Sequence, residues 1–232
     1  MSTFDLFNPT DDHKALRELT HDLAKGVIEP QVKEFDEKEP LNEALLRRMG
    51  SEYNLFGITI PAEAGGHGLD ATASVIVHEE LSYSDAAFTL SYLAHEVLFV
   101  NNLYHAAQQP LRDKYIPPVL DGTAIAGMAM SEPGAGTDVL GMRTSASRRG
   151  DRYVLNGAKM WISGIDAADW GVLFARTGAR GDRGGITAFV VDPKRAGLRL
   201  QRIGVMRSYQ PFQVFLDDYE VPVEDRIGEE GE

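Results

Sequence analysis

Residues 123–138 read TAIAGMAMSEPGAGTD, and the hydrophobic pattern of the chain changes within this stretch. Before it, from Pro9 to about Gly122, apolar residues recur at helical spacing, as Leu16 and Leu19 do. After it, short runs with alternating side chains predict strands, separated by Gly, Asp and Pro. A run of helices followed by a run of strands favours an α+β fold of two domains over a wound β-α-β fold.

The expected domains are a helical one at residues 1–123 and a β-domain, barrel-like or sandwich-like, at residues 124–232. Asn8, Thr10 and Asp11 are candidate caps for the first helix, which we expect to end before Pro30. The other expected helices cover residues 41–49, 70–82, 85–107, with Asp85 as the cap, and 110–120. The expected strands cover residues 124–130, 152–155, 171–175, 186–191, 198–203 and 212–216.

Composition excludes several classes of function. Lys and Arg number 23 against 35 Asp and Glu, so the formal net charge of −12 argues against nucleic acid as a partner. The chain of 232 residues contains no cysteine, which excludes disulfides, thiolate metal sites and thiol nucleophiles. His78 and His95 each lack a second histidine at helical spacing, so we expect no metal site. No apolar run is long enough to cross a membrane and the start is unlike a signal peptide, so we expect a cytoplasmic protein.

Residues 130–138, MSEPGAGTD, follow an expected strand and contain two glycines. Backbone N–H groups in such a loop, with the hydroxyls of Ser131 and Thr137, can hold the polar edge of a flat ring or a pyrophosphate. The glycine spacing differs from that of a dinucleotide-binding fingerprint or a P-loop. Taken alone, a tight turn between two strands is the simpler interpretation.

Residues 156–163 read NGAKMWIS. Asn156-Gly157 predicts a hairpin turn, and the strand after it places Trp161 and Ser163 on one face. A Trp there can shield an aromatic cofactor while the Ser hydroxyl bonds to a ring nitrogen. The alternative is a core Trp beside a satisfied Ser, which burial statistics alone favour.

The two segments are more specific in combination than either is alone. With LFGI at residues 55–58, and with Pro61 and Gly65-Gly66, they follow the order and spacing of the acyl-CoA dehydrogenase family, which the chain resembles over essentially its whole length. LSYLAH at residues 90–95 and MAMS at residues 128–131 are most similar to the isovaleryl-CoA, short branched-chain branch.

The resemblance implies FAD as the cofactor, held where the two domains meet. By similarity, Ser131 bonds to the pyrimidine edge of the flavin, Trp161 shields the isoalloxazine ring, and Ser163 bonds to N5. The implied flavin-binding residues are Met128, Ala129, Met130, Ser131, Thr137, Trp161, Ile162 and Ser163. The implied substrate residues are Thr137, at the CoA part, and Tyr92 and Ala94, in the acyl pocket.

The implied reaction is the FAD-dependent conversion of an acyl-CoA thioester to a trans-2-enoyl-CoA, with an electron-transfer flavoprotein or a similar acceptor and a tetrameric assembly. Family members normally continue into a C-terminal helical domain that carries the glutamate base, so we expect no catalytic base in these residues. The chain departs from the family at residues 206–211, MRSYQP, where Arg-Gly-Ser is usual. Two other functions stay open: an inactive flavin- or CoA-binding partner subunit, and a flavin oxidase or monooxygenase-type relative.

Overall fold

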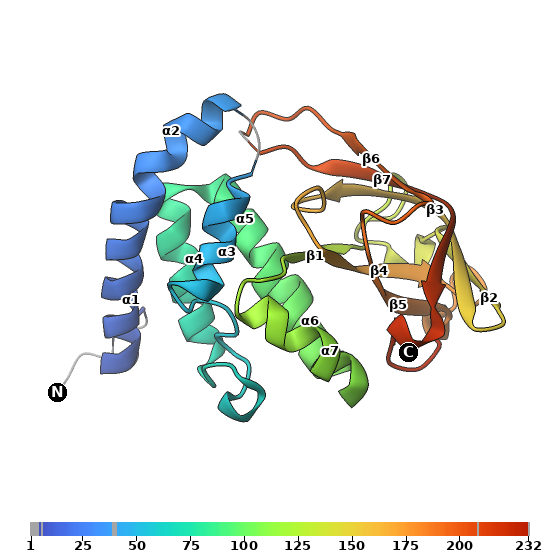
Figure 1. Cartoon of the computed structure of the whole chain (residues 1–232), viewed down its shortest axis with the longest axis horizontal. Helices are drawn as coiled ribbons and strands as arrows, with labels where there is room; N and C mark the ends of the chain where they lie inside the picture. The colour runs from blue at the N-terminus through green and yellow to red at the C-terminus, as the bar shows by residue number, and fades with distance from the viewer. Residues whose placement is uncertain (1–4, 6, 39–40, 208, 232) are drawn as a thin grey trace.

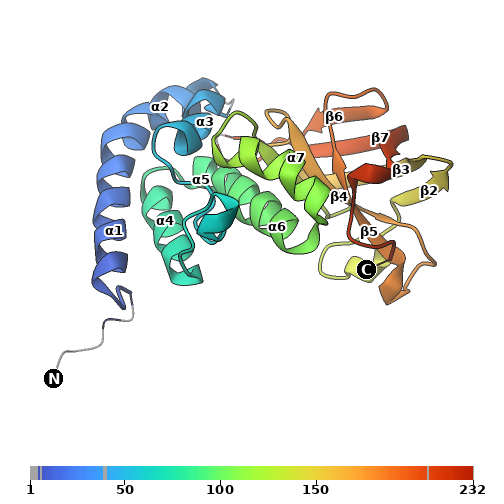
Figure 2. The same ribbon diagram turned by 60° about the horizontal axis from the view of Figure 1, so that its bottom comes forward.

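The computed structural model describes residues 5, 7–38, 41–207 and 209–231, with the helices preceding the strands along the chain (Figure 1). The change from helix to strand falls between Leu120, the end of the last α-helix, and Ala126, the start of the first strand. The two parts lie side by side in both ribbon views (Figure 2). The predicted α+β order is therefore confirmed.

The helical part contains α-helices and two π-helical segments. In chain order they are α1 (Asp11–Leu23), η1 (Ala24–Ile28, π), α2 (Glu29–Lys38), α3 (Glu43–Ser51), α4 (Ala71–Ser84), α5 (Ala86–Leu93), η3 (Ala94–Asn101, π), α6 (Asn102–Ala106) and α7 (Gln109–Leu120). Side-chain caps fix several of the starts, because an oxygen that accepts a backbone N–H of the first turn satisfies a donor with no partner inside the helix. Thr10 caps α1, and Asp85 accepts the N–H groups of Ala87 and Phe88, both at 2.9 Å.

The first helical stretch does not end before Pro30. The segment η1 follows α1 without a break and leads into α2, in which Pro30 is the second residue. Proline lacks an N–H, and in a regular α-helix its ring clashes with the carbonyl four residues earlier. The N–H of Glu29 bonds to the carbonyl of Ala24, five residues back, so the hydrogen-bond pairing is already shifted where the proline enters. The π-helical segment thus overrides the predicted stop.

The β part forms one eight-stranded sheet in the order β6-β7-β3-β2-β4-β5-β8, with β1 parallel to β4. The strands are β1 (Ala126–Ala129), β2 (Ser145–Arg149), β3 (Arg152–Ile162), β4 (Trp170–Arg176), β5 (Ile186–Val191), β6 (Leu198–Arg202), β7 (Phe212–Pro222) and β8 (Arg226–Ile227). A buried cluster that includes Leu155, Leu173 and Phe189 draws side chains from β3, β4 and β5. β2 and β8 were not predicted, because β2 buries only Ala146 and β8 has two residues.

Asn156-Gly157 does not turn the chain. The strand β3 continues through both residues, and its pairing with β7 shifts register at this point. The Asn156 side chain donates to Asp218 Oδ1 at 3.0 Å and accepts the Asp218 N–H at 2.9 Å. A Cβ on Gly157 would lie 2.6 Å from Thr144 Oγ1. The predicted hairpin is therefore wrong here: cross-strand bonds stabilise a bulge, and the chain turns earlier, at residues 150–151.

A shared core and one histidine join the helical and β parts. Phe99 of η3 packs in one buried cluster with Ala126 of β1 and Val172 of β4. His95 is fully buried between the parts, with Nδ1 accepting the Ala126 N–H and Nε2 facing the Val119 carbonyl, each at 3.0 Å. Since Nδ1 accepts, the proton is on Nε2 and the ring is neutral. Burial lowers the pKa of His95 to about 4.

The neighbouring Glu96 fixes the loop that contains LFGI. Its carboxylate accepts the Gly57 N–H at 2.8 Å and the Ile58 N–H at 2.7 Å. Burial raises the pKa of Glu96 to about 7, against the effect of these two hydrogen bonds. Two adjacent buried groups therefore hold two different contacts, one between the parts and one within the helical part.

Candidate functional site

The loop at residues 130–138 is fixed by the strand that carries the second motif. The N–H of Met160 donates to the Ser131 carbonyl at 2.8 Å, and Lys159 Nζ donates to the Met130 carbonyl at 3.1 Å. Lys159 is fully buried and also pairs with Glu132 at 2.8 Å. The two predicted segments are therefore parts of one site.

Glu132 supports the shape of this loop. Its carboxylate accepts the N–H groups of Arg143 at 2.7 Å and Thr144 at 3.0 Å, in addition to Lys159. Burial acts to raise the pKa of Glu132, but the hydrogen bonds, first of all from Lys159, lower it overall. Burial lowers the pKa of Lys159 to about 8, although Glu132 acts in the opposite direction. Both oxygens of Glu132 are thus occupied by the fold.

Trp161 adopts a rare backbone conformation at the end of β3. Its φ is 65°, in the left-handed region that bulky residues seldom occupy, and 53% of its surface is exposed. The pairing of β3 with β7 shifts register between Lys159 and Ile162, which accommodates this conformation. The indole is therefore not a core side chain, and strained exposed residues of this kind cluster at ligand sites.

Ser163 lies directly after β3 and contacts a loop between β6 and β7. Its Oγ accepts a hydrogen bond from Arg207 Nη2 at 2.8 Å. The guanidinium lies 5.6 Å from the ring centroid of Tyr209, whose hydroxyl donates to Asp166 at 2.7 Å. Burial lowers the pKa of Arg207, which is partly buried, and raises that of Tyr209, which is almost fully buried.

Unpartnered polar atoms gather beside Ser163. Among the residues that the structure describes, three buried side-chain atoms have no hydrogen-bond partner, and two of them are Ser91 Oγ and Arg207 Nη1. A Cβ on Gly164 would lie 4.0 Å from the Ser91 Cβ and 3.8 Å from the Tyr209 hydroxyl. Because buried polar groups nearly always have partners, these atoms fit a polar ligand bound here. The donors around Ser163 and the exposed indole of Trp161 suit a flat aromatic ring with polar edges.

The chain matches two family descriptions in succession, "Acyl-CoA dehydrogenase, N-terminal domain" at residues 10–123 and "Acyl-CoA dehydrogenase, middle domain" at residues 127–218. The chain belongs to the acyl-CoA dehydrogenase family. The mitochondrial isovaleryl-CoA dehydrogenase of Arabidopsis thaliana is 34% identical over 227 residues, which cover 95% of this chain and 55% of that protein. The chain thus spans about half the length of this curated relative.

Two solved structures have the same fold over nearly the whole of this chain. Butyryl-CoA dehydrogenase from Megasphaera elsdenii superimposes with a TM-score of 0.89 at 29% identity, covering 99% of this chain and 61% of that one. PigA, in its FAD complex, superimposes with a TM-score of 0.90 at 25% identity, covering 99% of this chain and 60% of that one.

The other predicted site residues lie on several elements of the fold. Met128 and Ala129 are on β1, Ile162 is buried at the end of β3, and Thr137 is exposed on the loop. Tyr92 and Ala94 are buried in the helical part, where Tyr92 packs on Phe56 and donates to the Leu55 carbonyl. The Tyr92 side chain is thus a satisfied core group, and a role for it at a substrate stays a prediction.

Three contributors to the site were missed by sequence reasoning. Lys159 lies inside the second motif, where only the structure shows that it is buried and paired with Glu132. Arg207 lies in the segment, residues 206–211, that departs from the family pattern. This departure drew attention to the position but did not indicate what the side chain does. Ser91 carries no signal, since only the packing of α5 against the turn at Gly164 brings it to the site.

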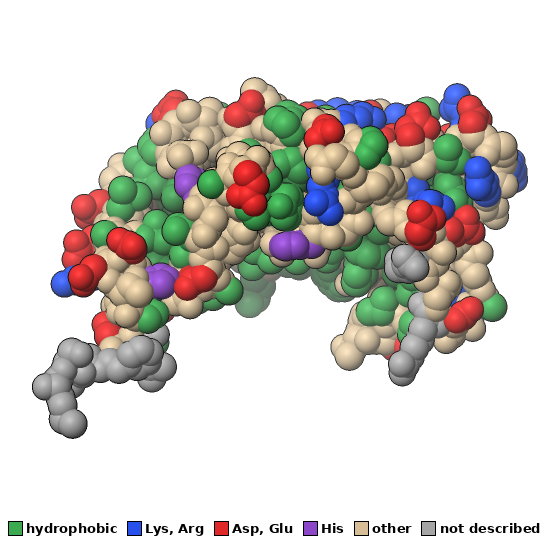
Figure 3. All heavy atoms as spheres, turned by 90° about the horizontal axis from the view of Figure 1, so that it is seen from below, with side chains coloured by type: hydrophobic (Ala, Val, Ile, Leu, Met, Phe, Trp, Pro, Cys, Tyr) green, Lys and Arg blue, Asp and Glu red, His purple; other side chains and the backbone are tan. Residues whose placement is uncertain are grey.

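A separate apolar groove runs along α4. It has a volume of about 770 Å³ and is lined by Leu69, Val75, Leu93, Val97 and others from α4, α5 and η3. His78 also lines it, and burial lowers the pKa of this imidazole, whose Nε2 has no partner among the described residues. Seen from below, exposed hydrophobic side chains lie between acidic ones on the helical part (Figure 3).

The described residues contain neither a candidate membrane-spanning helix nor a cluster of metal-ligating side chains. No described helix is long and apolar enough to cross a membrane. Within the same residues, no three His, Asp or Glu side chains come together as a metal-ligand set would require.

Proposed function

We propose that this chain forms the FAD-binding and part of the acyl-CoA-binding site of an acyl-CoA dehydrogenase that converts a thioester to a trans-2-enoyl-CoA. The observation that carries the proposal is that Lys159 joins the two motif segments. At the same end of β3 lie Trp161, whose backbone is in the left-handed region, and Ser163, which accepts a hydrogen bond from Arg207. The domain division is proposed to lie between Thr123 and Ala124.

Each residue then has a distinct task. FAD, when bound, accepts the hydride that leaves the β-carbon of the acyl group. Trp161 covers the ring and excludes water, and the Ser163 hydroxyl donates to a ring nitrogen. Backbone groups of the loop at residues 128–131, with the Ser131 hydroxyl, bind the polar ring edge, while Thr137 is directed to the CoA part. Rigid donors matter because loss of one that faces developing charge typically reduces rate about a hundredfold or more.

The base that takes the α-proton is proposed to come from outside these residues. Glu132, the acidic residue of the first motif, has both oxygens engaged by the fold. An electron-transfer flavoprotein or a similar acceptor, and a tetrameric assembly, are proposed from family membership. The identity to isovaleryl-CoA dehydrogenase favours a short branched acyl group.

Tryptophan fluorescence tests FAD binding, because the chain has only two tryptophans. Trp170 packs against Tyr115 within the core between the two parts, with their ring centroids 4.7 Å apart. FAD is expected to quench emission in the wild type and in Trp170→Phe, and to have little effect on the remaining emission of Trp161→Phe. Equal quenching in both variants contradicts the placement of the ring at Trp161, and no FAD binding by the wild type contradicts the proposal.

Turnover is tested with the FAD-loaded chain alone and with a longer protein that also carries the base. Because the base is proposed to lie outside these residues, isovaleryl-CoA or butyryl-CoA is expected to leave the flavin absorbance of the chain alone unchanged, and to bleach it with formation of the enoyl-CoA in the longer protein. FAD that binds but never bleaches in the longer protein supports the inactive partner-subunit function. Consumption of O₂ with a substrate other than a CoA thioester supports the oxidase or monooxygenase-type function.

A further inference from the structure

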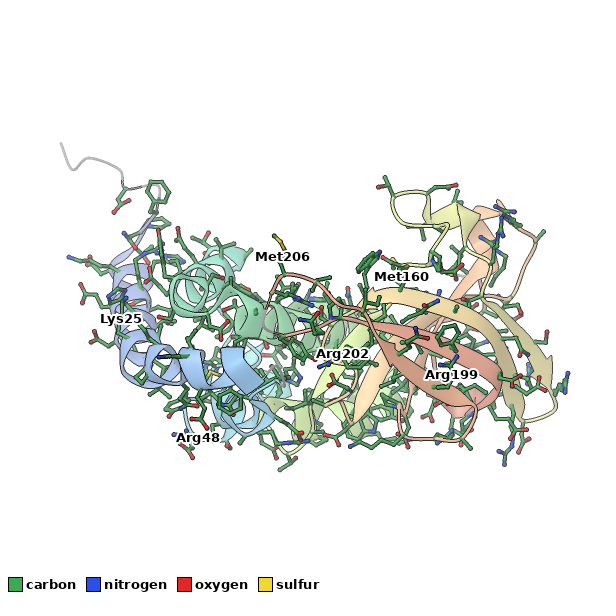
Figure 4. All side chains as sticks on the ribbon, turned by 90° about the horizontal axis from the view of Figure 1, so that it is seen from above. Lys25, Arg48, Met160, Arg199, Arg202 and Met206 are labelled. Atoms are coloured by element: carbon green, nitrogen blue, oxygen red, sulfur yellow. The ribbon has the colours of Figure 1, made fainter. Side chains whose placement is uncertain are left out.

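The loop between β6 and β7 brings a cation to Ser163. Figure 4 shows Met206 of this loop close to the helical part, whereas Arg199 lies farther along the sheet. The next residue, Arg207, is partly buried, and its Nη2 donates to Ser163 Oγ at 2.8 Å. The face of Tyr209, itself held by Asp166, lies against the guanidinium. Arg207 is therefore held by several contacts and not free to move in solvent.

The bond from Arg207 determines which way the Ser163 hydroxyl points. A hydroxyl has one hydrogen and two lone pairs. Because the guanidinium is only a donor, it occupies a lone pair of Oγ, and the hydroxyl hydrogen must point elsewhere. Within the described part of the chain, the structure records no acceptor for that hydrogen. Ser163 is thus prepared to donate to a ligand.

Arg207 also has a donor to spare. Its Nη1 is buried without a partner among the described residues, as is the nearby Ser91 Oγ. A buried donor on a cation carries a larger desolvation penalty than a neutral one, so an acceptor with negative charge is the partner that would relieve it. The unpaired donor and the oriented hydroxyl therefore favour the same kind of ligand, one with an acceptor nitrogen or oxygen and a tendency to gain negative charge.

We infer that Arg207 is a positioning residue that orients the Ser163 hydroxyl toward the flavin and stabilises the ring more strongly when it is reduced than when it is oxidised. The inference rests on the proposed function, since it requires FAD at this site. It assigns a role to a side chain that touches the ring chiefly through Ser163. Planarity and charge both matter here, so Lys is a poor substitute for Arg at this position.

The test compares three variants of the FAD-loaded protein by the affinity for oxidised and reduced FAD and by the midpoint potential of the bound flavin. Arg207→Gln is expected to weaken the binding of reduced FAD about tenfold more than that of oxidised FAD, the factor typical of a lost charge-assisted hydrogen bond. The midpoint potential shifts to more negative values accordingly. Arg207→Lys, which keeps the charge, is expected to show a smaller shift. Arg199→Gln is the control, because it removes an exposed cation of the same hairpin that packs on Phe215 at 4.0 Å.

A double variant separates positioning from general electrostatics. In a Ser163→Ala background the additional effect of Arg207→Gln on the midpoint potential is expected to fall to less than half of its value in the wild type, since the hydroxyl that Arg207 orients is gone. Equal potentials for Arg207→Gln and Arg199→Gln, or fully additive effects of the Ser163 and Arg207 substitutions, overturn the inference. Should Arg207→Gln fail to fold, Arg207→Lys in both backgrounds gives the same comparison. Failure of the wild type to bind FAD instead overturns the proposed function.

Discussion

Lys159 illustrates how a single buried residue determines the shape of the site. It is fully buried, yet it binds a carbonyl of one motif and the carboxylate of Glu132. Its position in the second motif is visible in the sequence, but its partner is 27 residues away and only the fold brings the two together. The same holds for Ser163 and Arg207, 44 residues apart. The sequence was enough to single out Trp161 and Ser163 as candidate site residues, but not to find Arg207, the partner of Ser163.

Replacing Lys159 by Met is expected to destabilise the protein by about 3–5 kcal/mol, because Glu132 is then left as a buried charge without its cation. Urea unfolding followed by circular dichroism measures the change. Lys194→Met is the matched control: Lys194 pairs with Asp169 at 2.9 Å but is 62% exposed, so its loss is expected to cost less than about 1 kcal/mol. Similar losses in the two variants would show that the Lys159 pair contributes no more than a surface contact.

At the scale of single elements, β3 shows where short-range rules stop being sufficient. The dipeptide Asn156-Gly157 is a strong hairpin signal, but the strand continues through it with a bulge, where Asn156 is bonded twice to Asp218 across the sheet. Pro30 is the helical counterpart, since the adjoining π-helical segment lets the helix continue. In both cases the type of element could be predicted from the sequence, but its end could not. The end of β3 depends on the contact with Asp218, and that of the helix on the shifted hydrogen bonds of η1.

Gly157→Ala tests the bulge in β3. The new Cβ would lie 2.6 Å from Thr144 Oγ1 and 2.7 Å from Thr144 Cα, at a φ of 147°. Since backbone cannot move aside cheaply, we expect a loss of at least about 2 kcal/mol in the free energy of unfolding. Gly150→Ala is the control: its φ is 64°, but the new Cβ would meet no atom within 4 Å beyond the adjacent residues, so only about 1 kcal/mol is expected from backbone strain. An equal effect at the two positions would mean that the close approach to Thr144 is not significant.

At the scale of the whole molecule, two adjacent buried groups have opposite pH dependences. The pKa of His95 falls from 6.5 to about 4 on folding, so its stabilisation is complete above pH 6.5 and is lost as the pH falls toward 4. The pKa of Glu96 rises from 4.5 to about 7, so its contribution decreases as the pH rises from 4.5 through 7. Between these limits the two contributions oppose each other.

Urea unfolding at pH values from 4 to 8 tests this balance by difference. The stability of the wild type minus that of His95→Gln is expected to increase with pH between 4 and 6.5. The stability of the wild type minus that of Glu96→Gln is expected to decrease with pH between 4.5 and 7. Two differences with the same sign of slope would refute the assignment of neutral His95 and a destabilised Glu96 carboxylate.

The segment that joins the helical and β parts is tied down along its length. The Ala124 N–H donates to the Pro118 carbonyl at 2.8 Å, and the Ile125 N–H donates to Asp169 at 3.0 Å. Asp169 also binds Arg47 at 2.8 Å, a residue of the helical part. A protein engineer who wishes to split this chain into two separately expressed pieces, or to insert a reporter, should therefore avoid the apparent domain junction. The exposed turn at Gly150, where an added Cβ would meet no atom within 4 Å beyond the adjacent residues, offers a better point of entry.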